Sequence, residues 1–166
     1  MLTSIRKFQE NDVPYKVKWI NDERNNKYLH YDLPLELEKT YKWFKSLETR
    51  HDRIDYTILY NHLPVGLIGL LGIDNQKKEA EYYICIGEEG VKGKGVASEA
   101  TKLLVDQAKR VFDIGTIYLY TEVDNIRAQK LFEKTGFVRK QTLRNHLYYN
   151  GRNIDRYLYT LDLVSN

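Results

Sequence analysis

The chain has 166 residues, which is enough for one domain with a single sizeable hydrophobic core. Its 26 basic and 23 acidic residues leave a formal net charge of +3, too small to indicate a nucleic-acid-binding or membrane-surface protein. No apolar run approaches the roughly 20 residues that span a bilayer, and strand-like sequence begins at once without a signal peptide. We therefore expect one domain over residues 1–166, located in the cytoplasm, with no nucleic-acid or membrane partner.

The first part of the chain alternates strand-like and helical patterns. Residues 2–8 form a plausible strand, and residues 13–20 carry apolar side chains at helical spacing before the polar run 21–26. Pro34 is expected in the first turn of a second helix, because its fixed φ angle suits that position. Apolar residues at helical spacing follow it: Leu37, Tyr41, Phe44 and Leu47.

Three strands are predicted in the middle of the chain. Residues 54–60 and 65–73 have strand patterns joined by a tight turn over 61–64, and another strand is expected over 79–87. Cys85, the single cysteine, lies in the last of these apolar strands. We interpret it as a small buried hydrophobic residue rather than a nucleophile, and it excludes a disulfide within the chain.

Two helices with a strand between them are predicted next. The helix over 95–112 carries apolar residues on one face: Val96, Ala100, Leu103, Leu104, Ala108 and Val111. Residues 116–122 have a strand pattern. The next helix, over 125–135, is expected to stop at Gly136 with Phe137 beyond it, the arrangement of a Schellman motif.

A hairpin is predicted near the C-terminus. Asn150-Gly151 lies between two strand-like runs, and this dipeptide is the strongest short-range hairpin signal. The order of elements predicts an α+β domain around a mixed, mostly antiparallel sheet.

A glycine-rich basic loop connects the last of the three middle strands to the following helix. Gly93 and Gly95 free the backbone of Cβ crowding, so successive N–H groups can converge on one anion. Lys92 and Lys94 add full charges, and the positive end of the helix favours the same anion. This pattern predicts a diphosphate-binding turn.

Two common diphosphate-binding loops fail on spacing. A P-loop requires Gly-x-x-x-x-Gly-Lys-Ser/Thr; counted from Gly90 the second glycine is Gly95, but Val96 stands where the lysine is needed. A dinucleotide-binding Gly-x-Gly-x-x-Gly/Ala motif follows the first strand of its fold. This loop lies past mid-chain and has Ser98 at the third small position, so neither class is expected.

The run Lys92-Gly-Lys-Gly-Val-Ala97 resembles the Gln/Arg-x-x-Gly-x-Gly/Ala pyrophosphate loop of the GNAT superfamily of acyl-CoA-dependent N-acetyltransferases. Downstream, Asn125-Ile-Arg-Ala128 and Leu131-Phe-Glu-Lys-Thr-Gly-Phe137 resemble the helix that follows the fifth strand in that superfamily. The resemblance covers residues 63–163 and is closest to the branch of ribosomal-protein N-terminal, polyamine and amino-sugar N-acetyltransferases.

This resemblance implies a three-layer, GNAT-like fold with about six to seven strands and about four helices, forming one N-acetyltransferase domain. It also implies acetyl-CoA as cosubstrate and a small-molecule or peptide amine as acceptor. Homodimers are frequent among proteins of this kind, so a second copy of the chain is a further candidate partner.

The resemblance also implies how CoA is held. The fourth and fifth strands should splay apart below the loop, so that the pantetheine arm pairs with the exposed fourth strand like an added strand. A free backbone N–H there could stabilise an oxyanion. Asn125 should lie beside the pantetheine and could also cap its helix. The residues implied in cofactor binding are Ile84, Cys85, Ile86, Lys92, Gly93, Lys94, Gly95, Val96, Ala97, Ser98, Asn125 and Phe132.

The attacking amine must be neutral, which makes a general base useful. At pH 7 a primary amine of pKa about 10 is neutral in only about one molecule in a thousand, equivalent to about 4 kcal/mol, whereas an α-amine needs only about 1 kcal/mol. Glu81 matches the strand glutamate of many relatives, and we identify it as the candidate catalytic base, acting directly or through a water. Strand alternation places it on the same face as Tyr83 and Cys85.

Phe132 departs from the family pattern. Many members have a tyrosine there that protonates the departing thiolate, and a phenylalanine cannot. A thiol of pKa about 8.5 is already a fair leaving group near neutral pH, and a water or one of four tyrosines could substitute: Tyr82, Tyr83, Tyr120 and Tyr148. The departure disfavours polyamine acetylation and supports an alternative, a catalytically weak acyl-CoA-binding module that senses or scaffolds.

Acceptor recognition is expected from the first two helices with their connector and from the C-terminal hairpin. The candidates in the first group are His30, Tyr31, Asp32, Glu36 and Trp43, and those in the second are His146, Tyr148, Tyr149 and Asp155. The four histidines show no paired metal-ligand spacing, so no metal is expected.

Overall fold

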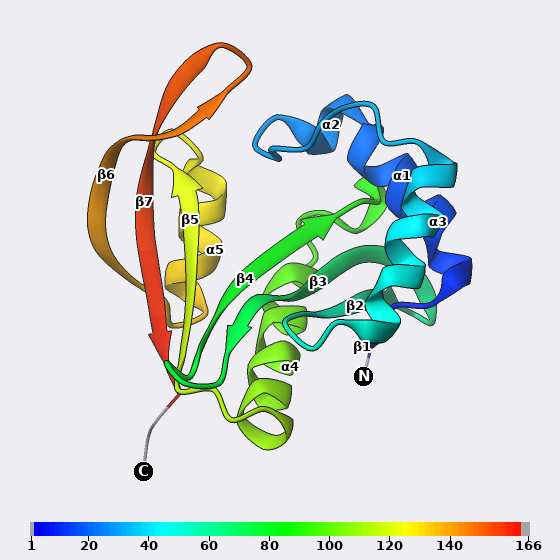
Figure 1. Cartoon of the computed structure of the whole chain (residues 1–166), viewed down its shortest axis with the longest axis horizontal. Coiled ribbons are helices and arrows are strands. Elements are labelled where there is room, and N and C mark those ends of the chain that lie inside the picture. The colour runs from blue at the N-terminus through cyan, green and yellow to red at the C-terminus, as the bar shows by residue number, and fades with distance from the viewer. Residues whose placement is uncertain (1, 164–166) are drawn as a thin grey trace.

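The computed structural model describes residues 2–163, and within them seven strands form one sheet in the order β1-β2-β3-β4-β5-β7-β6 (Figure 1). The strands are β1 (Thr3–Lys7), β2 (Ile54–Tyr60), β3 (Leu63–Asp74), β4 (Glu79–Ile86), β5 (Thr116–Glu122), β6 (Val138–Tyr149) and β7 (Arg152–Asp162). Neighbouring strands are antiparallel except β4 and β5, which are parallel. The predicted mixed, mostly antiparallel sheet is confirmed.

Five α-helices lie in the described part of the chain: α1 (Val13–Asn21), α2 (Glu23–Asn26), α3 (Leu37–Ser46), α4 (Val96–Val111) and α5 (Ile126–Lys134). Helices α1 and α3 pack on one face of the sheet, and α4 and α5 pack on the other, which gives three layers. The helix beyond the predicted four is α2, a single turn within the polar run. It forms because Asp22 caps it, accepting a hydrogen bond from the Arg24 N–H at 2.9 Å.

The two faces of the sheet carry separate cores because side chains alternate along each strand. In β4, Ala80 and Tyr82 join the core beneath α4 and α5, whereas Cys85 joins the core beneath α1 and α3. Burial raises the pKa of the Cys85 thiol to about 11. The cysteine is therefore a protonated, buried residue, as its position in an apolar strand predicts.

Local predictions based on short-range chemistry are confirmed at two turns. Helix α5 ends in a Schellman motif, with the Phe137 N–H bonded to the Phe132 carbonyl (2.9 Å) and the Gly136 N–H to the Glu133 carbonyl (3.2 Å). Gly136 has a φ of 102°, which favours glycine. The Asn150-Gly151 hairpin joins β6 to β7 as expected, with positive φ angles of 51° and 75°.

Three local predictions are wrong. Helix α3 begins at Leu37, so Pro34 lies in the extended connector before it rather than in its first turn. The turn between β2 and β3 contains only Asn61 and His62, whose φ angles of 51° and 68° make a two-residue hairpin turn tighter than the predicted one. Val111, assigned to the buried face of α4, is 66% exposed because it is the last residue of that helix.

The parallel strands β4 and β5 pair over only three positions, Glu79↔Thr116, Ala80↔Ile117 and Glu81↔Tyr118. Beyond them the strands diverge (Figure 1), while β4 stays paired with β3 as far as Ile86. The edge of β4 that faces β5 is therefore open beyond Glu81. The candidate active site lies at this opening.

Candidate active site

A cavity of about 490 Å³ lies where β4 and β5 diverge. Its wall on β4 is formed by Ile84, Cys85 and Ile86, three residues predicted to bind the cofactor. Helices α2, α4 and α5 and the glycine-rich loop supply the rest, including Lys92, Gly93, Gly95, Val96, Ala97, Ser98 and Asn125. Ten of the twelve predicted cofactor residues thus line one cavity.

The glycine-rich loop is shaped by backbone conformation rather than by lack of space. Gly93 and Gly95 have φ angles of 84° and 80°, a region that other residues rarely adopt, yet a Cβ on either would meet nothing within 4 Å. Gly95 is the N-cap of α4 and brings no side-chain cap. The first N–H groups of this 16-residue helix, from Val96 to Ser98, are therefore available to an anion in the cavity.

The two loop lysines lie differently from each other. The Lys92 ammonium is held in the cavity wall by Asn25 Oδ1 at 2.7 Å and by an ion pair with Glu89. Lys94 does not line the cavity, and its Nζ lies 5.9 Å from the centre of the Tyr60 ring. The predicted anion contact by the Lys94 side chain therefore has no support in this conformation.

Sequence reasoning missed a row of cations on α5. Arg127, Lys130 and Lys134 all line the cavity, because their spacing places them on one face of the helix. That spacing was visible in the sequence, but the face it lines depends on how α5 packs on the sheet. These cations make the cavity attractive to a polyanion.

Asn125 and Phe132, both predicted to touch the cofactor, have different surroundings. Asn125 lines the cavity and caps α5, accepting a hydrogen bond from the Ala128 N–H at 3.3 Å. Phe132 is 7% exposed and packs in the core against Tyr82, Phe137 and Tyr159. It does not line the cavity.

Glu81 lies at the point where the two strands separate, opposite Tyr118. Burial raises the pKa of its carboxyl, and the positive charge of Arg156 on β7 partly opposes that shift. Burial also raises the pKa of the Tyr118 hydroxyl, with the Glu81 carboxylate adding to the shift. A half-buried carboxylate beside a tyrosine and an arginine can accept a proton at a higher pH than an exposed one.

The four tyrosines named as substitutes for the missing acid lie in different places. The Tyr82 hydroxyl bonds Thr101 in the core under α4 (2.8 Å), and the Tyr83 hydroxyl donates to Asp55 (2.5 Å). Tyr148 is 70% exposed. The Tyr120 and Tyr118 rings pack edge to face with their centres 5.8 Å apart, and both lie on the Glu81 face of the sheet.

The connector between α2 and α3 crosses to the other half of the sheet. His30 Nε2 lies 2.7 Å from a carboxylate oxygen of Glu122, which is 4% exposed at the end of β5. The Tyr149 hydroxyl of the hairpin donates to the Tyr31 carbonyl at 2.5 Å. Three predicted acceptor residues, His30, Tyr31 and Tyr149, thus join the two halves of the sheet.

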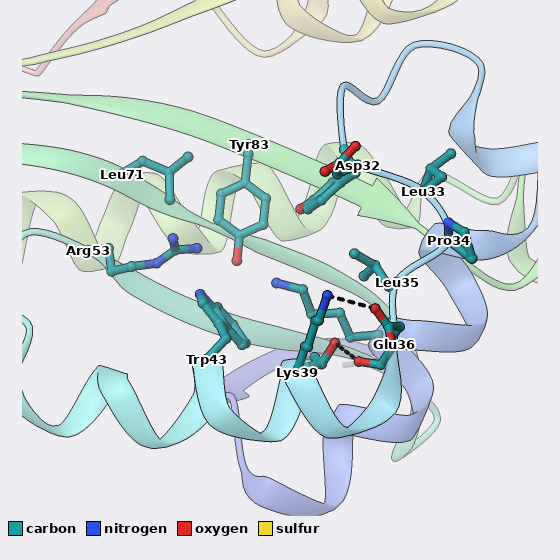
Figure 2. A pocket seen from close by; sticks show the side chains of 13 residues that line it. Asp32, Leu33, Pro34, Leu35, Glu36, Lys39, Trp43, Arg53, Leu71 and Tyr83 are labelled. Atoms are coloured by element: carbon teal, nitrogen blue, oxygen red, sulfur yellow. Dashed lines mark hydrogen bonds and ion pairs between the residues drawn. The ribbon is translucent and has the colours of Figure 1, made fainter.

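A second pocket, of about 710 Å³, lies on the face covered by α1 and α3 (Figure 2). Four predicted acceptor residues line it: Tyr31, Asp32, Glu36 and Trp43. The other five candidates do not line it: His30 lies in the connector, and His146, Tyr148, Tyr149 and Asp155 lie on the β6–β7 hairpin. Figure 2 shows Arg53, Trp43 and Tyr83 directed toward its centre.

No helix within residues 2–163 is both long and apolar enough to cross a membrane. The same residues contain no group of three or more metal-ligating side chains placed to hold an ion.

The splayed strands, the uncapped helix start and the half-buried glutamate lie within the part of the chain that matches a known protein family. The family described as "Acetyltransferase (GNAT) domain" matches residues 3–138. The chain belongs to the GNAT family of acetyltransferases. This GNAT protein is 26% identical over 157 residues to spermidine N(1)-acetyltransferase of Vibrio cholerae serotype O1, a match that covers 90% of the chain and 86% of that relative.

Solved structures show the same fold as this GNAT protein. The spermidine N-acetyltransferase of Vibrio cholerae in complex with CoA and spermine superposes with a TM-score of 0.89 at 21% identity, covering 98% of this chain and 96% of that one. RimL, a ribosomal L7/L12 alpha-N-protein acetyltransferase in complex with coenzyme A, gives 0.86 at 20% identity, covering 98% and 94%. The predicted family, fold and CoA cosubstrate class are confirmed.

Proposed function

We propose that this GNAT enzyme transfers an acetyl group from acetyl-CoA to a primary amine by direct attack in a ternary complex. The observation that carries the proposal is the gap between β4 and β5, with an anion-binding loop at one end and Glu81 at the other. The amine nitrogen forms the amide bond, the carbon–sulfur bond breaks, and the amine loses a proton.

The residues present fit CoA. The open edge of β4 at Ile84–Ile86 offers backbone groups to the amides of the pantetheine arm, in the manner of an added strand. Gly93 to Ser98 supply N–H groups, and α5 supplies three cations, for the phosphates. Acetyl-CoA would supply the thioester, and the chain would orient it and hold charge at each end.

Glu81 is the proposed proton acceptor. An amine arriving as an ammonium must lose a proton before it attacks, and a carboxylate with a raised pKa is a better base for that step than an exposed one. The positive charge of Arg156 partly balances that of the carboxylate. Its guanidinium in turn donates to Nδ1 of His146 at 3.0–3.1 Å.

The departing thiolate does not depend on Phe132, which lies in the core. Tyr118 and Tyr120 supply the β5 hydroxyls on the Glu81 face, whereas the Tyr83 hydroxyl already donates to Asp55. We assign proton donation to the β5 pair or to a water that they hold. With a thiol pKa of about 8.5, the loss of one dedicated acid costs little near neutral pH.

The test is acetyl-CoA turnover measured by free-thiol release, with spermidine, amino sugars and short peptides with free N-termini as acceptors. Release that depends on one amine class supports the proposal and identifies that class. CoA binding without acceptor-dependent release would instead favour the alternative, a catalytically weak module that binds acyl-CoA to sense or scaffold.

A further inference from the structure

Lys16, on α1, is a buried lysine in the second pocket. The residue is only 5% exposed, and it lines the pocket together with Tyr31 and Trp43. Its Nζ lies 3.5 Å from the centre of the Trp43 ring and 5.9 Å from that of Tyr31. Within residues 2–163 no hydrogen bond or ion pair is formed by this ammonium, and it is not sealed off from the pocket, because no fully buried side-chain nitrogen in that range lacks a partner.

The nearby carboxylate is already occupied. Asp55 accepts two hydrogen bonds from Arg53, at 2.7 and 2.8 Å, and one from the Tyr83 hydroxyl at 2.5 Å. The floor of the pocket therefore holds two cations, the buried Lys16 and the partly buried Arg53, against one buried anion, Asp55, which is paired with Arg53. At the rim, Glu36 is exposed and pairs with Lys39 at 2.9 Å.

An unpaired buried charge is costly unless something compensates it. The groups facing Lys16 are Asp55, Arg53 and the Cys85 thiol, and burial lowers the pKa of its ammonium to about 8, so that it is still mainly charged at pH 7. The rings of Trp43 and Tyr31 offer partial compensation through cation–π contact. An anion in the pocket would complete the compensation of the Lys16 charge.

The pocket adjoins the proposed site of chemistry. Tyr83 lines the pocket and follows Glu81 by two residues on the same strand face, which places the pocket wall about 7 Å from Glu81. The connector forms a common wall, since Leu29 lines the CoA cavity and Tyr31 lines the pocket. A molecule lying in the pocket can therefore present an amine to Glu81.

We propose that the pocket holds the carboxylate of the amine acceptor, paired with Lys16, and that the acceptor is an amino-acid-like or peptide molecule carrying both groups. This inference rests on the proposed function. Two extended residues span at most about 7 Å, so a dipeptide has the right reach. The Lys16 ammonium has no carboxylate partner and repels a polyamine, and the pocket therefore selects against the spermidine type of acceptor.

The experiment compares ligands that differ in one charge. Calorimetric binding of the dipeptide alanylalanine and of its C-terminal amide is measured on the wild-type protein and on two variants, Lys16→Met and Lys42→Met, beside thiol release with each amine and with spermidine. Lys42 is the control because it is an α3 lysine with a side chain 77% exposed, and it does not line the pocket. Methionine keeps the stem of the side chain and removes only its charge.

We expect the wild-type protein and Lys42→Met to bind the free acid at least tenfold more tightly than the amide, and Lys16→Met to lose this preference. Equal affinity for acid and amide in the wild-type protein would overturn the inference, even if Lys16→Met does not fold. Turnover of spermidine without any preference for the acid would also overturn it, while leaving the transferase proposal intact. Binding that prefers the acid, without turnover of any amine, would sustain the pocket and refute the proposed catalysis.

Discussion

At the scale of single residues, Glu81 is where the chemistry can be tested most directly. General acid–base catalysis contributes about 10²–10⁴-fold to rate, so we expect Glu81→Gln to lower kcat by about 100-fold with little change in CoA affinity. The wild-type rate should fall at low pH as Glu81 takes up its proton, at a pH above the ordinary glutamate range because burial raises its pKa. The pH dependence of kcat/KM for both proteins measures this.

Glu81→Gln has no titrating carboxylate at this position, so its pH profile should lack the acid limb, the fall in rate at low pH. Arg156→Met serves as a matched probe, because it removes the positive charge that lowers the Glu81 pKa and should move the limb to higher pH. Identical pH profiles in wild type and Glu81→Gln would exclude Glu81 as the base.

The lowered pKa of Lys16 leads to a separate prediction about how stability depends on pH. Its pKa is about 8 in the folded protein against 10.5 for an ordinary lysine, so between pH 8 and 10.5 the unfolded chain binds more protons than the folded one. The free energy of unfolding should therefore rise with pH across this window, by about 3 kcal/mol from this residue. Urea unfolding at a series of pH values measures the rise.

Lys16→Met should flatten this rise and be more stable than wild type below pH 8, because an uncompensated buried charge is removed. Lys42→Met, which removes an exposed lysine, should retain the wild-type pH dependence. A Lys16→Met protein that is less stable than wild type at pH 7 would show that the ammonium is compensated.

At the scale of the elements, the loop before α4 carries the anion site. Gly95→Asp should abolish CoA binding, because it places a negative charge at the helix start that faces the phosphates. Two like charges about 4 Å apart repel by about 4 kcal/mol near a protein surface, which amounts to a loss of affinity of about 1000-fold. Isothermal titration with CoA measures the loss.

Gly95→Asn is the matched control, because asparagine has the size of aspartate without its charge. It also tolerates the φ of 80° about as well as aspartate does. Any loss that both variants share is conformational, and the difference between them is electrostatic. Equal affinities for CoA in the two variants would show that the CoA phosphates do not bind at this helix start.

Element ends were predictable where one or two residues decide them. Gly136 stops α5 and Asn150-Gly151 turns the hairpin because those residues adopt positive φ at little cost. Pro34 misled the prediction because its fixed φ suits an extended connector as well as a first helical turn. The turn predicted over 61–64 is shorter in the structure, because Leu63 and Pro64 already pair with β2 and only Asn61 and His62 turn the chain.

At the scale of the whole molecule, the cofactor cavity was largely predictable, whereas the acceptor side was not. The loop and β4 residues lie close together in the sequence and carry a recognisable pattern, so ten of the twelve predicted residues line the cavity. Lys16 meets Trp43 and His30 meets Glu122 only through the packing of α1, α3 and the connector. His30 and Glu122 are separated by 92 residues, and no local sequence pattern predicts such a contact.

The same architecture leaves the two halves of the sheet weakly joined. Strands β4 and β5 share three paired positions, and the remaining contacts between the halves include those of the connector with Glu122 and Tyr149. A ligand that pairs with the open edge of β4 and contacts α5 bridges both halves. CoA should therefore stabilise the whole fold as well as fill a cavity.

At a concentration of 100 times its Kd, CoA should add about 2.7 kcal/mol to the free energy of unfolding. For a protein of this size that corresponds to a rise in Tm of about 5–10 °C. Thermal melts with increasing CoA measure the rise, and Gly95→Asp should show none while Gly95→Asn should follow wild type at saturation. A wild-type Tm that does not move with CoA would mean that CoA does not bind the folded protein preferentially, and the gap between β4 and β5 would then lose its assigned role.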